Sequence, residues 1–197
     1  MKVLELFSGT RSIGKCCDKL GWESVSVDLI LPADHKVDIM DFDYKQYDKD
    51  EFDIIWASPP CTEYSKAKTR GIRDIEGSNK IVIKTLEIIN YFNCKWWFIE
   101  NPQTSLLKHQ SFMKDLKYVD GDYCMYGLPY RKRTRFWTNK IFDEEPLKLC
   151  NKNCGSFING KHIGSCGNGK SKYTDKHYSQ YDKYIIPEDL IFSLFLL

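Results

Sequence analysis

The chain has 197 residues, of which 29 are lysine or arginine and 27 are aspartate or glutamate, so its formal net charge is only +2. This length suits one α/β domain with a full core and a small appendage, and it excludes two large domains. The near-neutral balance excludes a strong overall attraction to nucleic acid. Any contact with a polyanion must therefore come from a local basic cluster.

Eight cysteines are present, and the chain opens on the strand-like run 2–7 rather than on a signal sequence. We therefore expect reduced, intracellular thiols and a cytoplasmic location instead of a disulfide framework. The apolar run 190–197 is shorter than the ~20 residues that a membrane span requires, so no membrane association is expected. It predicts a C-terminal helix that packs on the core.

The first hundred residues alternate short apolar runs with helix-like segments, a pattern typical of a parallel, doubly wound sheet. The predicted strands cover residues 3–7, 24–28, 52–57 and 96–100, and the predicted helices cover 13–20 and 81–92. Further along, 136–138 predicts a short aromatic strand, and 147–183 lacks periodicity and indicates an irregular lobe. We divide the chain into a main domain at 1–140, a small lobe at 141–184 and a final helix at 185–197.

Small residues follow the first predicted strand in the run Phe7-Ser8-Gly9-Thr10, which allows a ligand to approach the backbone and the free N–H groups of the next helix. Asp28 closes the second predicted strand about 20 residues later, where an acid bonds a ribose hydroxyl in nucleotide-binding α/β folds. Asp38 and Ile39 come after the following segment, at a position suited to adenine. The turn matches neither the dinucleotide fingerprint nor a Walker loop, which favours a mononucleoside-type cofactor over a phosphate-rich one. The alternative is that these acids are plain solvated loop residues.

Cys61 follows two prolines at the end of the predicted strand 52–57. Proline fixes φ and has no N–H, so the pair ends the sheet ladder and sets the backbone leading to the cysteine. Glu100 ends a second predicted strand, and ligands of open α/β sheets bind beyond the carboxyl ends of strands. A thiolate adds to an electron-poor carbon, and a carboxylic acid on a ring nitrogen makes a pyrimidine carbon electron-poor. The alternatives are a buried structural cysteine and a glutamate that caps a helix or forms an ion pair.

These motifs resemble, in order and spacing, those of DNA cytosine carbon-5 methyltransferases. The matching blocks are Phe7-Ser8-Gly9, Ser58-Pro59-Pro60-Cys61, Ile99-Glu100-Asn101 and Arg133-Thr134-Arg135. The compact pattern is most similar to the minimal enzymes of phages and large DNA viruses. The resemblance implies a Rossmann-like, S-adenosylmethionine-dependent methyltransferase fold with a small irregular recognition lobe. It also implies methyl transfer to carbon-5 of a cytosine flipped out of a DNA duplex.

The resemblance further implies roles for individual residues. Cys61 would add to carbon-6 of the cytosine, Glu100 would contact N3, and Arg133 and Arg135 would hold the base, its phosphate and the catalytic loop. Cofactor contacts are implied for Phe7, Gly9, Thr10, Asp28, Leu29, Asp38, Ile39 and Pro60. Nucleic-acid contacts are implied along the basic loop 62–78, at Ser65, Lys66, Lys68, Arg70 and Arg73. We expect a monomer, and the sequence leaves open whether a partner nuclease completes a restriction–modification pair.

The chain departs from the family at two motif positions. Arg11 stands where the family has a glycine, and Arg131 stands where it has a glutamine. The lobe 141–184 is short for a target-recognition domain, so we expect it to read only a few base pairs. Two alternatives stay open: the same chemistry on RNA such as tRNA, and a catalytically idle nucleic-acid-binding module. A methyltransferase of amino groups is less compatible, because such enzymes place an aromatic residue where Cys61 stands.

The lobe carries Cys150, Cys154, His162 and Cys166 in the pattern C-x3-C-x7-H-x3-C. Thiolates and an imidazole suit tetrahedral Zn²⁺, and a lobe too small for its own core would gain folding free energy from a structural zinc. The spacing is not that of a standard zinc finger. The alternative is that loops rich in Asn and Gly hold these cysteines by chance.

Overall fold

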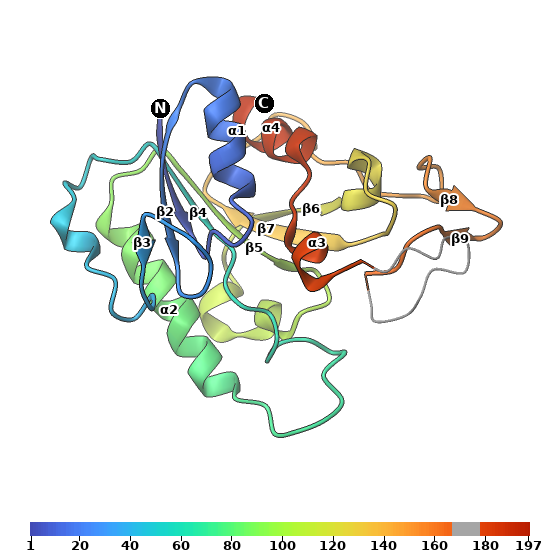
Figure 1. The fold of residues 1–197 in the computed structure, drawn as a ribbon, viewed down its shortest axis with the longest axis horizontal. Coiled ribbons are helices and arrows are strands. Elements are labelled where there is room, and N and C mark those ends of the chain that lie inside the picture. Colours follow the sequence, from blue (N-terminus) through green and yellow to red (C-terminus); the bar gives the residue numbers. More distant parts are fainter. Residues whose placement is uncertain (167–177) are drawn as a thin grey trace.

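A central β-sheet forms the body of the protein, and a small hairpin extends beyond one end of it (Figure 1). The computed structural model describes residues 1–166 and 178–197, so residues 167–177 of the predicted lobe lie outside the described part. The helices are α1 (Ser12–Leu20), α2 (Ile75–Tyr91), α3 (Gln180–Tyr184) and α4 (Glu188–Leu196). Short 3-10 helices are η1 (Tyr44–Gln46), η2 (Leu106–His109), η3 (Ser111–Met113) and η4 (Tyr123–Tyr126). The strands are β1 (Lys2–Leu6), β2 (Glu23–Asp28), β3 (His35–Lys36), β4 (Ile54–Ala57), β5 (Trp96–Pro102), β6 (Tyr118–Asp122), β7 (Arg133–Thr138), β8 (Phe157–Ile158) and β9 (Lys161–His162).

Strands of the described chain form the central sheet in the order β3-β2-β1-β4-β5-β7-β6. The neighbours from β3 to β5 pair in parallel, as the first hundred residues predict. β7 runs antiparallel to both β5 and β6. The sheet is therefore mixed. Strand β6 is not predicted from the sequence because Asp120, Gly121 and Asp122 have low strand propensity. Pairing with β7 compensates for this low propensity.

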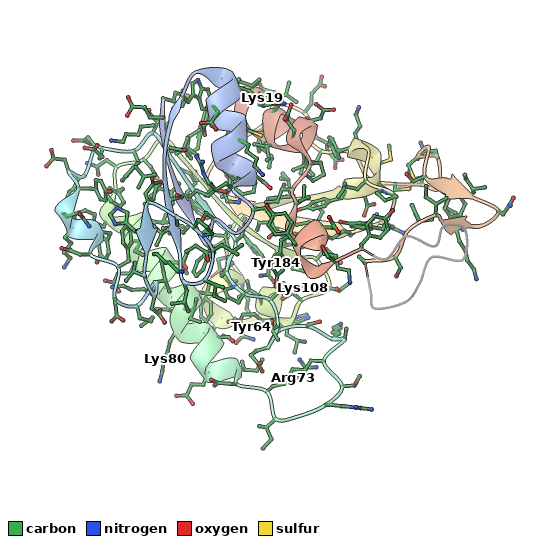
Figure 2. The ribbon with its side chains drawn as sticks, in the orientation of Figure 1. Lys19, Tyr64, Arg73, Lys80, Lys108 and Tyr184 are labelled. Atoms are coloured by element: carbon green, nitrogen blue, oxygen red, sulfur yellow. The ribbon has the colours of Figure 1, made fainter. Side chains whose placement is uncertain are left out.

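Helices cover both faces of the sheet, α1 and α4 on one and α2 on the other (Figure 1). β4 is buried along its whole length, and such a strand reads as a continuous apolar run. α4 buries Leu190, Ile191 and Leu194 in the core cluster that also contains Ile13 of α1. At the surface, Lys19 of α1 pairs with Glu188 of α4 at 2.5 Å (Figure 2). None of the helices in the described ranges combines the length and the apolar character needed to cross a membrane.

Helix α2 begins at Ile75, six residues before the predicted start at 81. The side chain of Asp74 accepts a hydrogen bond from the N–H of Gly77 at 2.8 Å and so caps the helix. The first turns are mostly polar, from Glu76 to Lys80, so apolar periodicity does not reveal them. The earlier start places the helix directly after the loop that follows Cys61.

The lobe contains a small hairpin, β8–β9, that the sequence analysis does not predict. Phe157 pairs with His162, and Ile158 pairs with Lys161. Asn159 and Gly160 between them have φ of 49° and 81°, the left-handed values that a type I′ hairpin turn requires. The Asn-Gly dipeptide is the sequence signal for this turn. The hairpin positions His162 opposite an aromatic ring at the far end of the molecule.

Candidate active site

The candidate site lies where the sheet order reverses. From β1 the chain passes to β2 and β3 on one side and then returns to β4 on the other side. Ligands of open α/β sheets bind at such a point, beyond the carboxyl ends of the strands. At this edge the Phe7–Gly9 turn follows β1 and Cys61 follows β4, Asp28 is the last residue of β2, and Glu100 lies near the end of β5. The fold thus places four of the predicted motifs at one edge.

The turn after β1 has an unusual backbone. Phe7, Gly9 and Arg11 all have positive φ, of 59°, 52° and 54°. Only glycine adopts such values freely, so the two larger side chains hold a strained conformation of the kind that clusters at ligand sites. The N–H of Gly9 donates to the Asp28 carboxylate at 2.8 Å, and the buried hydroxyl of Ser8 has no hydrogen-bond partner among the described residues. Arg11 stands where the family has a glycine, and its backbone keeps a conformation that glycine adopts freely.

Asp28 organises the predicted cofactor surface. Its carboxylate accepts hydrogen bonds from the N–H groups of Gly9, Ile30 and Leu31, each at 2.8 Å. An ionised carboxylate offers about four acceptor positions, so a ligand hydroxyl still has one available. Leu29 and Ile30 beside it are 58% and 74% exposed. A partly free acid next to uncovered apolar side chains fits a nucleoside.

The other predicted cofactor residues occupy varied positions. Asp38 accepts from the N–H of Met40 at 2.9 Å, and Ile39 is buried in the core. The buried Thr10 hydroxyl lies 2.8 Å from that of Ser12. Pro60 is exposed. The residues best placed to contact a cofactor directly are therefore Asp28, Leu29 and the backbone of Gly9.

Glu5, which was not predicted from the sequence, holds the residues that follow this turn. The side chain is buried in β1 and accepts hydrogen bonds from the N–H groups of Ile13 and Gly14 at 3.1 and 3.0 Å. Burial raises the pKa of Glu5 to about 7, although these two hydrogen bonds partly offset that effect. An acid within an apolar strand is the signal that could have found it. Glu5 fixes the start of α1 against β1 and so shapes the loop between them.

We expect Glu5 to make stability depend on pH. The pKa is about 7 in the folded protein and near 4.5 when exposed, so the unfolded chain loses its proton first. The stabilisation is complete below pH 4.5 and is lost as pH rises toward 7, a difference on the order of 3 kcal/mol in free energy of unfolding. Glu5→Gln should flatten this part of the profile measured by urea unfolding, whereas the exposed Glu23→Gln should not. Parallel profiles for wild type and Glu5→Gln would refute this role.

Hydrogen bonds from neighbouring strands fix the backbone before Cys61. The buried Asn101 side chain donates to the carbonyl of Pro59 at 3.0 Å, and the N–H of Ser58 donates to Leu6 at 3.2 Å. Burial raises the pKa of the Cys61 thiol, and the charge of Glu100 raises it further, whereas Lys132 lowers it. The thiol is therefore protonated at neutral pH in the free protein. Cys61 and Glu100 are close enough to interact electrostatically.

Glu100 is 7% exposed and lies among polar partners. Its Oε1 accepts a hydrogen bond from the Tyr123 hydroxyl at 3.2 Å and lies 3.6 Å from the Lys132 ammonium. That ammonium also sits 4.7 Å from the centre of the Tyr123 ring. Sequence reasoning misses both residues, since a lysine inside a basic run carries no distinguishing signal. The Lys132 ammonium thus lies close to the Glu100 carboxylate and also lowers the pKa of the Cys61 thiol.

The two predicted arginines are each held by an aspartate of β6. Arg133 makes a two-pronged contact with Asp122 at 3.0 and 2.6 Å, and Arg135 makes one with Asp120 at 2.8 and 2.9 Å. Arg131 also reaches Asp122 at 3.2 Å. These contacts tie β7 to β6 across the ladder. The contacts of Arg133 and Arg135 within the described chain run to these aspartates rather than to Cys61 or Glu100.

The loop after Cys61 is held by its own side chains. Arg73 donates to the carbonyls of Glu63, Ser65 and Lys68 at 2.7–2.8 Å, and Lys68 pairs with Glu63 at 2.5 Å. Figure 2 shows Arg73 within the loop and Tyr64 nearer the body of the protein. Of the five predicted contact residues, Arg73, Lys68 and Ser65 therefore shape the loop, and Lys66 and Arg70 are exposed. Ile72, which was not predicted, is 95% exposed.

The predicted metal ligands need one correction. The donor atoms of Cys124, Cys150, Cys154 and His162 all lie within 4.8 Å of one another. Cys166 is exposed instead, and its sulfur contacts the carbonyl of Arg131 at 3.5 Å. Cys124 lies in η4, far from the others in sequence, so the spacing within the lobe could not reveal it.

The sheet order defines a Rossmann-like fold, and solved structures share it. A prophage-encoded protein of E. coli, described as a DNA modification methyltransferase, aligns over 70% of this chain and 46% of its own, with a TM-score of 0.54 and 15% identity. The methyltransferase EhMeth of Entamoeba histolytica aligns over 74% of this chain and 55% of its own, with a TM-score of 0.56 and 18% identity. The chain thus spans about half the length of these two solved structures.

Sequence similarity defines the family. The family model of the C-5 cytosine-specific DNA methylases matches residues 29–119. A protein of Frog virus 3 (isolate Goorha), described as a probable DNA (cytosine-5)-methyltransferase, is 38% identical over 154 residues, which cover 71% of each chain. The chain belongs to the family of C-5 cytosine-specific DNA methylases. The fold and family expected from the sequence motifs are confirmed.

Proposed function

We propose that this protein transfers a methyl group from S-adenosylmethionine to carbon-5 of a cytosine flipped out of a DNA duplex. The observation that carries the proposal is the position of Cys61. This thiol follows a backbone held by Asn101, interacts with Glu100, and lies at the edge where the Gly9 turn and Asp28 also end. Nucleophile, acid and nucleoside-binding surface therefore share one edge of the sheet.

S-adenosylmethionine, when bound, supplies an electrophilic methyl group. Asp28 has an acceptor position left for a ribose hydroxyl, and Leu29 offers an exposed apolar surface to an adenine. The unpartnered, buried Ser8 hydroxyl in the turn after β1 is a further polar group for the same ligand. The Phe7–Gly9 turn lets the ligand lie close to the backbone.

Cys61 and Glu100 divide the chemistry on the base. The Cys61 thiol gives its proton to the Glu100 carboxylate, its sulfur forms a bond to carbon-6 of cytosine, and Glu100 passes the proton on to N3, which draws electron density from the ring. Carbon-5 then carries the electron pair that takes the methyl group. The carbon-5 proton then leaves to solvent, N3 returns its proton to Glu100, and the sulfur–carbon bond breaks, which restores the aromatic ring and frees Cys61.

The loop 62–74 supplies the contacts to DNA. Lys66 and Arg70 are exposed and can meet phosphates, whereas Arg73 and Lys68 keep the loop in shape through internal contacts. The exposed Ile72 side chain can fill space beside the vacated stack, as apolar wedges do in other complexes. We infer a monomer that acts on one base at a time and needs no nuclease for its own chemistry.

Methyl incorporation tests the substrate. Purified protein with radiolabelled S-adenosylmethionine should label duplex DNA at least about tenfold faster than tRNA, with the label at carbon-5 of cytosine. Bisulfite sequencing of DNA from cells that express the protein would give the positions. Labelling of RNA alone would replace the proposal with the RNA alternative, and labelling of neither polymer would favour an idle binding module.

A further inference from the structure

Four metal-ligating side chains meet in the lobe, outside the site described above. Cys124 lies in η4, Cys150 and Cys154 lie on the loop before β8, and His162 lies in β9. All three thiols are buried, and the four donor atoms lie within 4.8 Å of one another. Three separate segments of the chain therefore bring soft ligands to a single point.

The separation of Cys150 and His162 suits a tetrahedral ion. With bonds of about 2.3 Å to sulfur and about 2.0 Å to nitrogen, a sulfur and a nitrogen ligand of zinc lie roughly 3.5 Å apart. The Cys150 sulfur and the His162 Nε2 are 3.6 Å apart. The His162 ring also stands edge-on to Phe157, with ring centres 5.2 Å apart, which restricts its orientation.

This part of the lobe has little apolar material to hold it. Among the residues that the structure describes, the cluster around the three cysteines includes only Met125 and Phe157 as further hydrophobic residues. A segment with so small a core commonly obtains its folding free energy from a metal. A bound ion would close the loop 150–162 and join it to η4.

The cluster is also connected to the predicted catalytic strand. The N–H of Cys150 donates to Asp122 at 2.8 Å, and the N–H of Asp122 donates to the carbonyl of Lys148 at 3.1 Å. Asp122 is fully buried and holds Arg133 with two hydrogen bonds. The loop that carries Cys150 and Cys154 is therefore hydrogen-bonded to Asp122, which positions Arg133.

We propose that Cys124, Cys150, Cys154 and His162 bind one structural zinc ion, which fixes the lobe to the end of β6 and thereby keeps Asp122 in place for Arg133. The cysteines bind as thiolates and release their protons when the ion enters. Cys166 takes no part. The ion is distant in function from the thiol chemistry of Cys61 and supplies shape rather than reactivity.

Metal analysis of the full chain tests this site. Protein expressed with zinc and dialysed against a weak chelator should contain one zinc per chain. Cys124→Ser and Cys154→Ser should each lose most of that zinc, and the matched control Cys166→Ser should keep it. Less than about a tenth of an equivalent in wild type, or loss of zinc in Cys166→Ser but not in Cys124→Ser, would overturn the assignment.

A second measurement covers the case in which the variants do not fold. Wild-type protein reconstituted with cobalt(II) should show the visible absorption of a tetrahedral cobalt–thiolate site, and a strong chelator should expose three additional thiols to a thiol reagent. The unfolding temperature should fall on chelation. Absence of the tetrahedral spectrum, or a chelator that changes neither thiol count nor unfolding, would contradict the proposal even if methylation is intact.

Discussion

Cys61→Ser is expected to abolish methyl transfer, with a loss of at least about 1,000-fold in the single-turnover rate. A hydroxyl is a far weaker nucleophile than a thiolate, and Cys61 is the thiol whose pKa the charge of Glu100 raises. The replacement is nearly isosteric, and Asn101 fixes the backbone through Pro59 rather than through Cys61. Binding of S-adenosylmethionine, measured by calorimetry, should therefore stay close to the wild-type value.

The matched control is Cys94→Ser, which alters another partly buried thiol. This variant should methylate DNA at the wild-type rate. A Cys61→Ser protein with full activity would show that the thiol is not the nucleophile. A Cys61→Ser protein that no longer binds the cofactor would show instead that the thiol supports the binding surface.

Glu100→Gln is expected to slow methyl transfer by roughly 100-fold, the usual effect of losing a general acid. Glutamine can still accept the hydrogen bond from the Tyr123 hydroxyl, but it cannot give a proton to N3, and it leaves the Lys132 ammonium without its carboxylate. Single-turnover kinetics with saturating cofactor would isolate this step. Glu23→Gln serves as the control because that side chain is 79% exposed on β2.

The same variant should change Cys61 in the opposite direction. The charge of Glu100 raises the pKa of the Cys61 thiol, so its removal lowers that pKa and increases the thiolate fraction at neutral pH. Iodoacetamide should then alkylate Cys61 faster in Glu100→Gln than in wild type, although methylation is slower. A general loss of structure would not give this pairing for one peptide. Unchanged alkylation together with wild-type methylation would remove Glu100 from the mechanism.

The sequence is most informative where chemistry depends on the ends of strands. The β4 run followed by two prolines identifies Cys61, and Glu100 and Asp28 follow because each closes an apolar strand. The parallel pairing of β2, β1, β4 and β5 then brings these groups to one edge of the sheet. Periodicity and turn chemistry are local properties, so residues within a single motif were accessible without coordinates.

Residues that act across the fold were not accessible. Lys132 and Tyr123 reach Glu100 only because β7 folds back antiparallel beside β5. Asp120 and Asp122 lie in a strand that its own residues do not favour, and arginines on β7 stabilise it. Such pairings depend on contacts between distant segments, for which local sequence carries no signal.

The loop and the lobe show the same limit. The basic loop predicts phosphate contacts for all of its cations, but Arg73 and Lys68 satisfy carbonyls and a carboxylate of the loop itself. In the lobe, the spacing suggests Cys166 as a ligand, whereas η4 delivers Cys124. The sequence shows which side chains can bind a phosphate or a metal, but the fold determines which partner each of them contacts.

Covalent trapping would show directly whether Cys61 is the nucleophile that bonds to cytosine. Wild-type protein would be incubated with S-adenosylmethionine and duplex DNA that contains 5-fluorocytosine, whose fluorine cannot leave as a proton does. The complex would then be digested and mapped by mass spectrometry. We expect a methylated 5-fluorocytosine adduct on the peptide that contains Cys61, and no adduct in Cys61→Ser. An adduct on any other cysteine, or methylation of ordinary cytosine without any trapped adduct, would contradict it.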